Sequence, residues 1–262
     1  MIDLKYVQVS SLDYDVWRAV TRLYLSDPLK HAYLMYDLIY ELDTVDVHFQ
    51  LSDRKIIGYL LIWKGLDDVA IHIWGNAHRL IDFIPVDRSM VIQVYSEDLV
   101  DPLVKYLKSK GNNVTTKTYL NMVVDKSDFK PYSVEKVLRL GEEDLNAFIE
   151  IKKVQGKVLS EEKARDLIKK WRYYGLYVDD KLVAIACAYL RMNEIWIVGD
   201  VFTHPDYRGK GYAKMVTSAV TKDAVTVEAK AFLHVKEDNI PAIKVYKALG
   251  YKILDKRTMD IL

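Results

Sequence analysis

Hydrophobic and polar residues alternate along residues 1–125 with two periods, every second position or every third to fourth position. The first period predicts strands with one buried face, and the second predicts helices with one apolar side. The resulting order is a strand, two helices, three strands, a short helix, a strand, a helix and a last strand. Their ranges are 5–9, 13–25, 29–42, 45–51, 55–63, 68–74, 77–83, 91–95, 98–110 and 114–124.

The second half of the chain repeats this element order after a polar, proline-containing segment at 125–132. Its predicted elements are 134–140, 142–154, 160–172, 175–178, 182–190, 194–202, 211–222, 229–235 and 241–249, followed by a closing pair of strands. Because the halves share an element order rather than residue identities, we interpret the chain as a tandem duplication. The sequence therefore predicts two α/β (α+β) domains, 1–125 and 133–262, joined by a linker at 126–132.

Half of the 262 residues are apolar, and 38 basic residues are balanced by 37 acidic ones. This composition predicts a soluble globular protein, and its near-zero net charge gives no field for binding nucleic acid or a membrane surface. The longest apolar runs, such as 184–190, fall short of the roughly 20 residues that span a bilayer. The lone Cys187 excludes an internal disulfide and is a poor nucleophile candidate in its packed strand. Since residues 1–10 lack a secretory signal, a cytoplasmic location is expected.

The segment 201–213 joins a strand end, a turn with two glycines and an amphipathic helix. Gly209 and Gly211 let the backbone curl so that its N–H groups converge, and the helix N-terminus adds the positive end of a dipole. Together these features suit a diphosphate. The alternative is a tight turn without a ligand, which a bare Gly-x-Gly would favour, so the neighbouring residues decide.

Two sequence motifs occur here in a fixed order, one that contains this turn and one that follows it downstream. The first fits Arg/Gln-x-x-Gly-x-Gly/Ala and consists of Arg208, Gly209, Lys210, Gly211, Tyr212 and Ala213. The second fits Asn-x-x-Ala-x-x-x-Tyr-x-x-x-Gly-aromatic and consists of Asn239, Ala242, Tyr246, Leu249, Gly250 and Tyr251. With both motifs, residues 133–262 resemble the GNAT superfamily of acyl-CoA-dependent N-acyltransferases.

The resemblance implies a fold of tandem GNAT-like domains, each a mixed, largely antiparallel sheet flanked by helices. It also implies that the loop 208–213 binds the pyrophosphate of coenzyme A, with acetyl-CoA as co-substrate and no metal. The main chain of Val201, Phe202 and Thr203 would hydrogen-bond the pantetheine arm, and Asn239 would contact the cofactor in addition to capping its helix.

Other nucleotide-binding motifs do not fit. A dinucleotide fingerprint would need glycine in place of Lys214, and the Walker pattern is absent around both glycines. The sequence also lacks Gly-x-Ser-x-Gly, His-Glu-x-x-His and Cys-x-x-Cys, which removes the simplest hydrolase, metalloprotease and redox interpretations. His72 and His78 suggest a metal pair only weakly, because no third ligand accompanies them, and surface or core positions are favoured.

The candidate catalytic residues are Tyr246 and His234. The resemblance implies that the Tyr246 hydroxyl protonates the departing CoA thiolate. Alternatively, Tyr246 is only an aromatic residue of the core, because Ile243 and Leu249 share its helix face. His234 occupies the place where some peptide N-acetyltransferases carry a glutamate, and its imidazole could accept the amine proton; the alternative is a structural histidine. Asp200 and Glu194 are further candidates of lower rank.

The first half has no equivalent of the phosphate loop, since residues 73–79 contain a single glycine. It resembles a degenerate GNAT-like domain that shapes the acceptor site, as in glycine N-acyltransferase-like proteins. The chain is therefore predicted to transfer an acyl group, most simply acetyl, from CoA to a primary amine of a small molecule, amino acid or peptide, directly in a ternary complex. The alternatives are a peptide or protein N-terminal acetyltransferase and a non-catalytic acyl-CoA-binding regulatory protein. Homodimer formation stays open.

Overall fold

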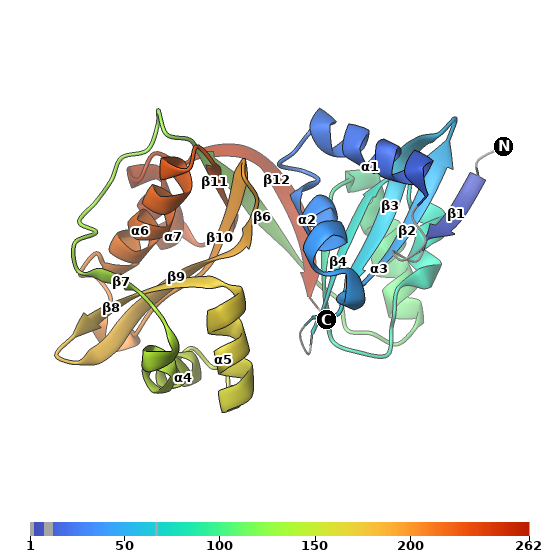
Figure 1. Ribbon diagram of the computed structural model, residues 1–262. Coiled ribbons are helices and arrows are strands. Elements are labelled where there is room, and N and C mark those ends of the chain that lie inside the picture. Colours follow the sequence, from blue (N-terminus) through green and yellow to red (C-terminus); the bar gives the residue numbers. More distant parts are fainter. Residues whose placement is uncertain (1–2, 8–12, 66–67, 262) are drawn as a thin grey trace. The chain divides into compact units, whose positions relative to one another are not determined.

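The computed structural model describes residues 3–7, 13–65 and 68–261 (Figure 1). The chain forms two compact units, of which unit 1 contains Met1–Tyr119 and Lys256–Leu262, and unit 2 contains Leu120–Asp255. The division therefore differs from the predicted boundaries at 125 and 133. The predicted linker 126–132 lies inside unit 2, where Tyr132 N donates to Ser218 Oγ at 2.8 Å.

Unit 1 contains a mixed sheet with the strand order β1-β2-β3-β4-β5-β12. β4 and β5 pair in parallel, and the other described neighbours pair antiparallel. The elements are β1 Asp3–Val7, α1 Tyr14–Ser26, α2 Ala32–Tyr40, β2 Val45–Ser52, β3 Lys55–Trp63, β4 Val69–Gly75, the 3₁₀ helix η3 His78–Phe83, β5 Met90–Val94 and α3 Val100–Ser109. The next strand, β6 Thr115–Val124, belongs to unit 2 from Leu120 onward. Residues 8 and 9 of the predicted first strand lie outside the described residues.

The alternation of side chains along β4 explains how unit 1 is layered. Ile71 and Ile73 pack against Leu103 and Leu107 of α3, in one continuous apolar cluster. Trp74, of opposite parity to Ile71 and Ile73, contacts His31 at the start of α2. Successive strand residues point to opposite faces, so α3 covers one face and α1 and α2 the other (Figure 1).

Unit 2 contains a mixed sheet with the strand order β6-β11-β10-β9-β8-β7. β10 and β11 are parallel, whereas β7 to β10 are antiparallel neighbours. The elements after β6 are β7 Val137–Arg139, α4 Leu145–Val154, α5 Glu161–Lys170, β8 Arg172–Val178, β9 Lys181–Arg191, β10 Ile195–Thr203, η6 Pro205–Tyr207, α6 Tyr212–Thr226, β11 Lys230–Lys236, α7 Ile240–Ala248 and β12 Lys252–Ile261. The predicted strand 134–140 thus shortens to β7.

The helices of unit 2 cover its sheet on both faces (Figure 1). α6 and α7 contribute Val216, Val220 and Ile243 to an apolar cluster with alternate residues of β8 to β11. On the other face, Phe148 of α4 packs edge-on against Tyr173 of β8 with ring centroids 4.6 Å apart. The predicted start of α5 is confirmed, because the Ser160 side chain accepts from Lys163 N and caps the helix.

The closing strand pair predicted from the sequence is a single strand, β12. No glycine or proline interrupts residues 252–261, so nothing forces a turn there. The strand begins in unit 2, and from Lys256 onward it belongs to unit 1. There it pairs antiparallel with β5, with Thr258 opposite Val94. The C-terminal residues therefore complete the sheet of the first unit, which sequence periodicity alone does not reveal.

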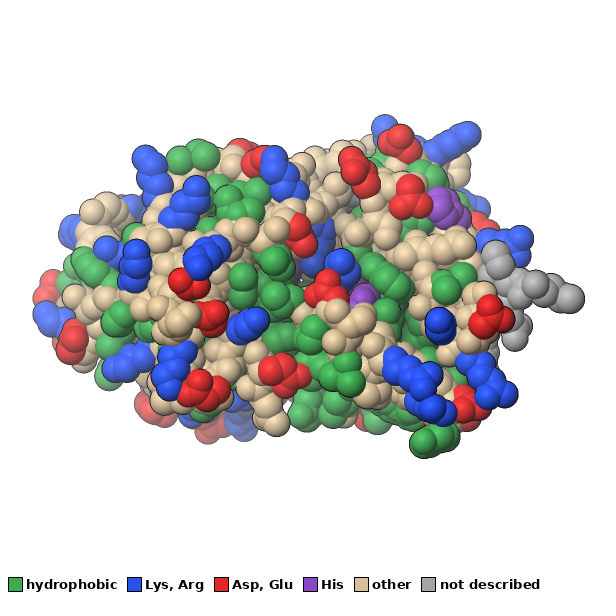
Figure 2. Space-filling model, turned by 90° about the horizontal axis from the view of Figure 1, so that it is seen from above, with side chains coloured by type: hydrophobic (Ala, Val, Ile, Leu, Met, Phe, Trp, Pro, Cys, Tyr) green, Lys and Arg blue, Asp and Glu red, His purple; other side chains and the backbone are tan. Residues whose placement is uncertain are grey.

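Charged residues of both signs are interspersed on the face of the molecule shown in Figure 2. Among the helices formed by the described residues, none has the length and apolar character needed to cross a membrane.

Candidate active site

The site is built around the second half of β10. The parallel pairing of β10 with β11 extends from Ile195 to Ile197, and beyond this point the described pairing of β10 is with β9 alone. The edge of β10 that faces β11 is therefore unpaired over Val198–Thr203. An open strand edge presents main-chain N–H and C=O groups that an extended ligand can bind as if it were a further strand.

The loop after β10 has the conformation that the glycine motif predicts. Gly209 and Gly211 have φ of 80° and 81°, in the left-handed region where glycine is favoured. Gly211 is the N-cap of α6, and the first backbone bond of the helix runs from Met215 N to Gly211 O at 3.1 Å. The N–H groups of the first helical turn therefore have no partner within the helix and are available to an anion.

Basic and aromatic side chains surround this loop. Arg208 Nε donates to Thr203 O at 3.3 Å, which ties the loop back to the strand end. The Lys210 and Lys214 ammonium groups lie over the rings of Tyr207 and Tyr132, at 5.2 and 3.3 Å from the centroids. Sequence reasoning missed Tyr132 because it lies in the predicted linker.

α7 carries the two other residues of the second motif. Asn239 caps the helix, since its Oδ1 accepts from Ala242 N at 3.3 Å. Tyr246 is buried in the cluster beneath α6, and its ring centroid is 5.9 Å from that of Tyr251. Burial raises the pKa of Tyr246 to about 12, so its hydroxyl keeps its proton at neutral pH. No hydrogen bond joins this hydroxyl to any described residue.

His234 on β11 begins a chain of polar contacts in unit 2 that runs through the buried Asn121 to the exposed Asp255. Its Nδ1 lies 2.6 Å from Asn121 Oδ1, and Asn121 Nδ2 donates to Asp255 Oδ1. Because the carboxylate of Asp255 can only accept, it fixes the Asn121 amide with its oxygen toward His234. In the neutral imidazole the proton is then on Nδ1, which leaves Nε2 as the basic nitrogen. Asn121 is 1% exposed, and its role was missed because it lies 113 residues from His234.

The two candidates of lower rank lie in different environments. Glu194 precedes β10, about 30 Å along the strand from Thr203, so the fold does not bring it to the loop. Asp200 is buried within β10 and pairs with Lys152 of α4. Burial tends to raise the pKa of Asp200, but Lys152 and Lys157 outweigh this effect and hold it below its usual range. The Asp200 carboxylate is therefore ionised, and its oxygens already accept hydrogen bonds from neighbouring side chains.

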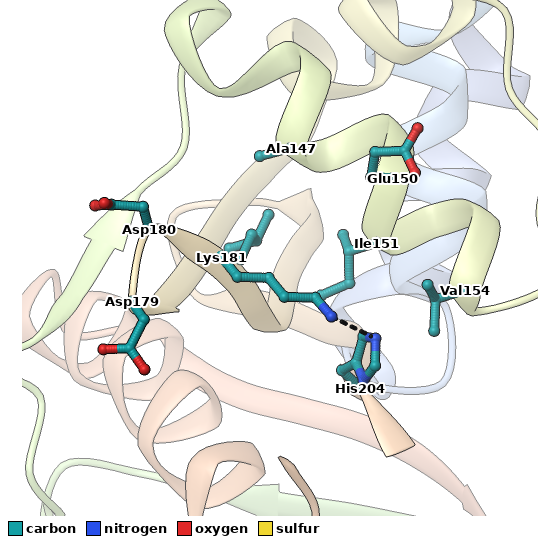
Figure 3. A pocket seen from close by; sticks show the side chains of 9 residues that line it. Ala147, Glu150, Ile151, Val154, Asp179, Asp180, Lys181 and His204 are labelled. Atoms are coloured by element: carbon teal, nitrogen blue, oxygen red, sulfur yellow. Dashed lines mark hydrogen bonds between the residues drawn. The ribbon is translucent and has the colours of Figure 1, made fainter. Parts of the chain in front are cut away.

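A cavity of about 410 Å³ lies beside the end of β10, between α4 and the turn that joins β8 to β9 (Figure 3). Ile151 and Val154 form an apolar wall, and Lys181 Nζ lies 3.0 Å from His204 Nε2. His204 directly follows Thr203, so the cavity borders the strand end. None of the predicted catalytic residues lines it.

His72 and His78, for which the sequence favoured core or surface positions over a metal site, each have another polar partner. His72 Nδ1 lies 2.9 Å from the Tyr95 hydroxyl, and His78 Nε2 lies 3.6 Å from Asp98 Oδ2. The part of the chain that the structure describes contains no group of three or more His, Cys, Asp or Glu residues that could hold a metal ion.

Residues 145–251 match the family model for the acetyltransferase (GNAT) family. This part of the chain, most of unit 2, is therefore a GNAT domain. A search of curated proteins finds no match to the chain.

Solved structures share the fold of the whole chain at low sequence identity. A Drosophila protein is 11% identical with a TM-score of 0.74, over 100% of this chain and 99% of the other. A GCN5-related N-acetyltransferase-like protein from Streptococcus suis is 13% identical with a TM-score of 0.63, over 94% and 98%. A tandem GNAT protein from the clavulanic acid biosynthesis pathway is 13% identical with a TM-score of 0.57, over 100% and 98%. The chain thus has the mixed α/β fold seen in tandem GNAT proteins.

Proposed function

We propose that unit 2 transfers an acyl group, most simply acetyl, from CoA to a primary amine. The observation that carries this proposal is the combination of an open β10 edge with a left-handed glycine loop at the start of α6, inside a GNAT domain. A structural turn would not need the neighbouring strand to leave its edge unpaired. Bound acetyl-CoA would supply the activated thioester.

The loop and strand end fit such a donor. A Cβ atom built on Gly209 would meet no atom within 4 Å, so this glycine borders open space that a diphosphate can approach. Thr203 Oγ1 is buried without a hydrogen-bond partner among the described residues. The main chain of Val201, Phe202 and Thr203 would bind the pantetheine amides, and the N–H groups of residues 211–213 would bind the diphosphate. Arg208 and Lys210 would add positive charge, and Asn239 a further polar contact.

His234 and Tyr246 are proposed as base and acid. With its proton held on Nδ1 by Asn121, His234 would accept the amine proton at Nε2, directly or through one water. Tyr246 would donate its hydroxyl proton to the sulfur as the thiolate departs, for which the raised pKa keeps it protonated. Transfer would be direct, because holding amine and thioester together supplies most of the rate advantage. Cys187 is buried and its pKa is raised by burial, which suits no covalent role.

Unit 1 is proposed as a degenerate counterpart without its own CoA site. Its β4 ends at Gly75, where a Cβ atom would meet Ile57 O at 2.2 Å. That carbonyl accepts from Asn76 N, so the turn packs against β3 and leaves no open cradle. Only the short η3 follows, in place of a helix with a free first turn. We propose that unit 1 contributes to acceptor selection.

A thiol-release assay with acetyl-CoA and separate pools of amines, amino acids and peptides tests the proposal. Release that depends on an amine pool supports acyl transfer. Release only with peptides would favour the N-terminal acetyltransferase alternative. Saturable acetyl-CoA binding without release in any pool would favour the regulatory alternative.

A further inference from the structure

β10 contains a backbone irregularity just before its predicted donor-binding segment. Asp200 has φ of +50°, a left-handed conformation that non-glycine residues rarely adopt inside a strand. The register with β9 shifts at the same place, because Gly199 is opposite Cys187 and Phe202 is opposite Ile185. Asp200 and Val201 together are therefore opposite one residue, which defines a β-bulge.

The Asp200 carboxylate is surrounded by donors from the helix side of the sheet. It accepts from Lys152 Nζ at 2.5 Å, from the Tyr173 hydroxyl at 2.7 Å and from Gln155 Nε2 at 2.8 Å. Lys157 Nζ lies 3.7 Å away. These contacts attach the bulge to the C-terminal end of α4 and to the residues that follow it.

Lys152 is the unusual partner in this cluster. Its side chain is 2% exposed, and its ammonium group also lies 5.7 Å from the centre of the Phe148 ring. Burying both members of an ion pair is expensive, and apolar residues of similar volume often give equal or greater stability. The left-handed φ of Asp200 adds a further cost of order 1–3 kcal/mol. Two unfavourable features at one position indicate a role other than stability.

We propose that the Lys152–Asp200 pair is a positioning device for the acyl donor. The pair holds the bulge, and the bulge turns the Val201–Thr203 main chain out of regular register, so that its groups face the donor rather than a neighbouring strand. The end of the β10–β11 pairing at Ile197, three residues before the bulge, is consistent with this role. The inference rests on the proposed function, since it assumes that the donor lies along this edge.

The test uses the double variant Lys152→Met/Asp200→Asn in the full-length chain. Methionine fills a similar volume, and asparagine tolerates the left-handed backbone while keeping a polar contact with Tyr173. Because no buried charge is left unpaired, the thermal midpoint should stay within about 5 °C of the wild type. Asp223→Asn is the matched control, since Asp223 also accepts from a tyrosine hydroxyl of β8, that of Tyr174 at 2.5 Å, but lies at the other end of α6.

Acetyl-CoA binding is measured by calorimetry, so the readout does not require turnover. The expected result is a Kd at least 10-fold higher in the double variant and within about 2-fold of wild type in Asp223→Asn, with all three proteins folded. An unchanged Kd in the folded double variant would overturn the positioning role. If the double variant does not fold, Lys152→Met alone is compared in the same way, because Asp200 then keeps its contacts with Lys157, Tyr173 and Gln155, and the same two outcomes decide. Failure of the wild type to bind acetyl-CoA would instead refute the proposed function on which the inference rests.

Discussion

At the scale of single residues, the site depends on a few positions whose backbone geometry excludes most side chains. Gly211 is such a position, because it combines a φ of 81° with a nearby aromatic side chain. A Cβ atom there would lie 3.4 Å from the Tyr132 hydroxyl. Glycine is therefore required for the shape of the loop. It also lies next to Tyr132, which was not predicted as a site residue from the sequence.

We expect Gly211→Val to weaken acetyl-CoA binding by 10-fold or more while the chain still folds. Valine disfavours positive φ and would distort the first turn of α6, where the free N–H groups converge. Calorimetry on the folded variant gives the Kd. Gly111→Val is a suitable control, since Gly111 also has positive φ but lies in unit 1, outside the loop. Equal affinity in Gly211→Val and wild type would remove the loop from the donor site.

Tyr246→Phe should lower kcat by roughly 100-fold and change acetyl-CoA affinity little, because the ring packing is kept and only the proton donor is lost. Since the pKa of Tyr246 is raised to about 12, the wild-type hydroxyl stays protonated across the usual assay range. The ratio of wild-type to variant kcat should therefore be constant between about pH 7 and 10. An unchanged kcat under conditions where chemistry limits the rate would reduce Tyr246 to a core aromatic.

Two buried histidines of unit 1 give a pH-dependent stability. Burial lowers the pKa of His72 to about 3 and that of His31 to about 4. Both are neutral when folded and bind protons more readily when unfolded, so their contribution is complete above about pH 6.5 and is lost as the pH falls towards 4. Urea unfolding of the full chain should show stability decreasing by roughly 1.4 kcal/mol per pH unit for each histidine in that window. His72→Gln should remove one such contribution, and an identical pH slope in the variant would contradict this assignment.

At the scale of elements, much of the fold follows from periodicity. The order of helices and strands, the Ser160 and Asn239 caps and the glycine loop could be predicted because each depends on residues close together in sequence. The β-bulge at Asp200 and the polar chain from His234 could not. Asn121 is 113 residues from His234 and 134 from Asp255, so only the assembled sheet brings the three together.

Asn121→Leu tests the polar chain between β11, β6 and β12. Leucine keeps the side-chain volume but removes the oxygen that accepts the hydrogen bond from Nδ1–H. His234 should therefore lose its preference for the Nδ1–H tautomer. Ring ¹⁵N chemical shifts report the tautomer directly. We expect kcat/KM to fall roughly 10-fold or more, because Nε2 would then carry the proton for part of the time. A wild-type His234 that is already protonated on Nε2 in its neutral form would contradict the proposed base.

At the scale of the whole chain, the two units have similar element orders but different strand-to-helix turns. Unit 2 has an open glycine loop before a long helix, whereas the turn at Gly75 in unit 1 is packed against Ile57 O. The sharing of β12 between the units was not predictable, because the last residues carry no signal for which sheet they join. It also means that cutting the chain at residue 133 would deprive unit 1 of β12.

We expect the full-length protein to bind one acetyl-CoA per chain. The reason is that only unit 2 combines left-handed glycines with an open strand edge among the described residues. Calorimetric titration of the intact chain gives the stoichiometry. Two equivalent sites would show that the turn after Gly75 also accepts the donor.

Amine-dependent release of thiol from acetyl-CoA by the full-length protein tests the central claim most directly. The claim predicts thiol release that requires both the protein and an amine, with one acetylated amine formed for each thiol, and a rate that falls strongly in Tyr246→Phe. A protein that binds acetyl-CoA but releases no thiol with any amine, amino acid or peptide pool would contradict it.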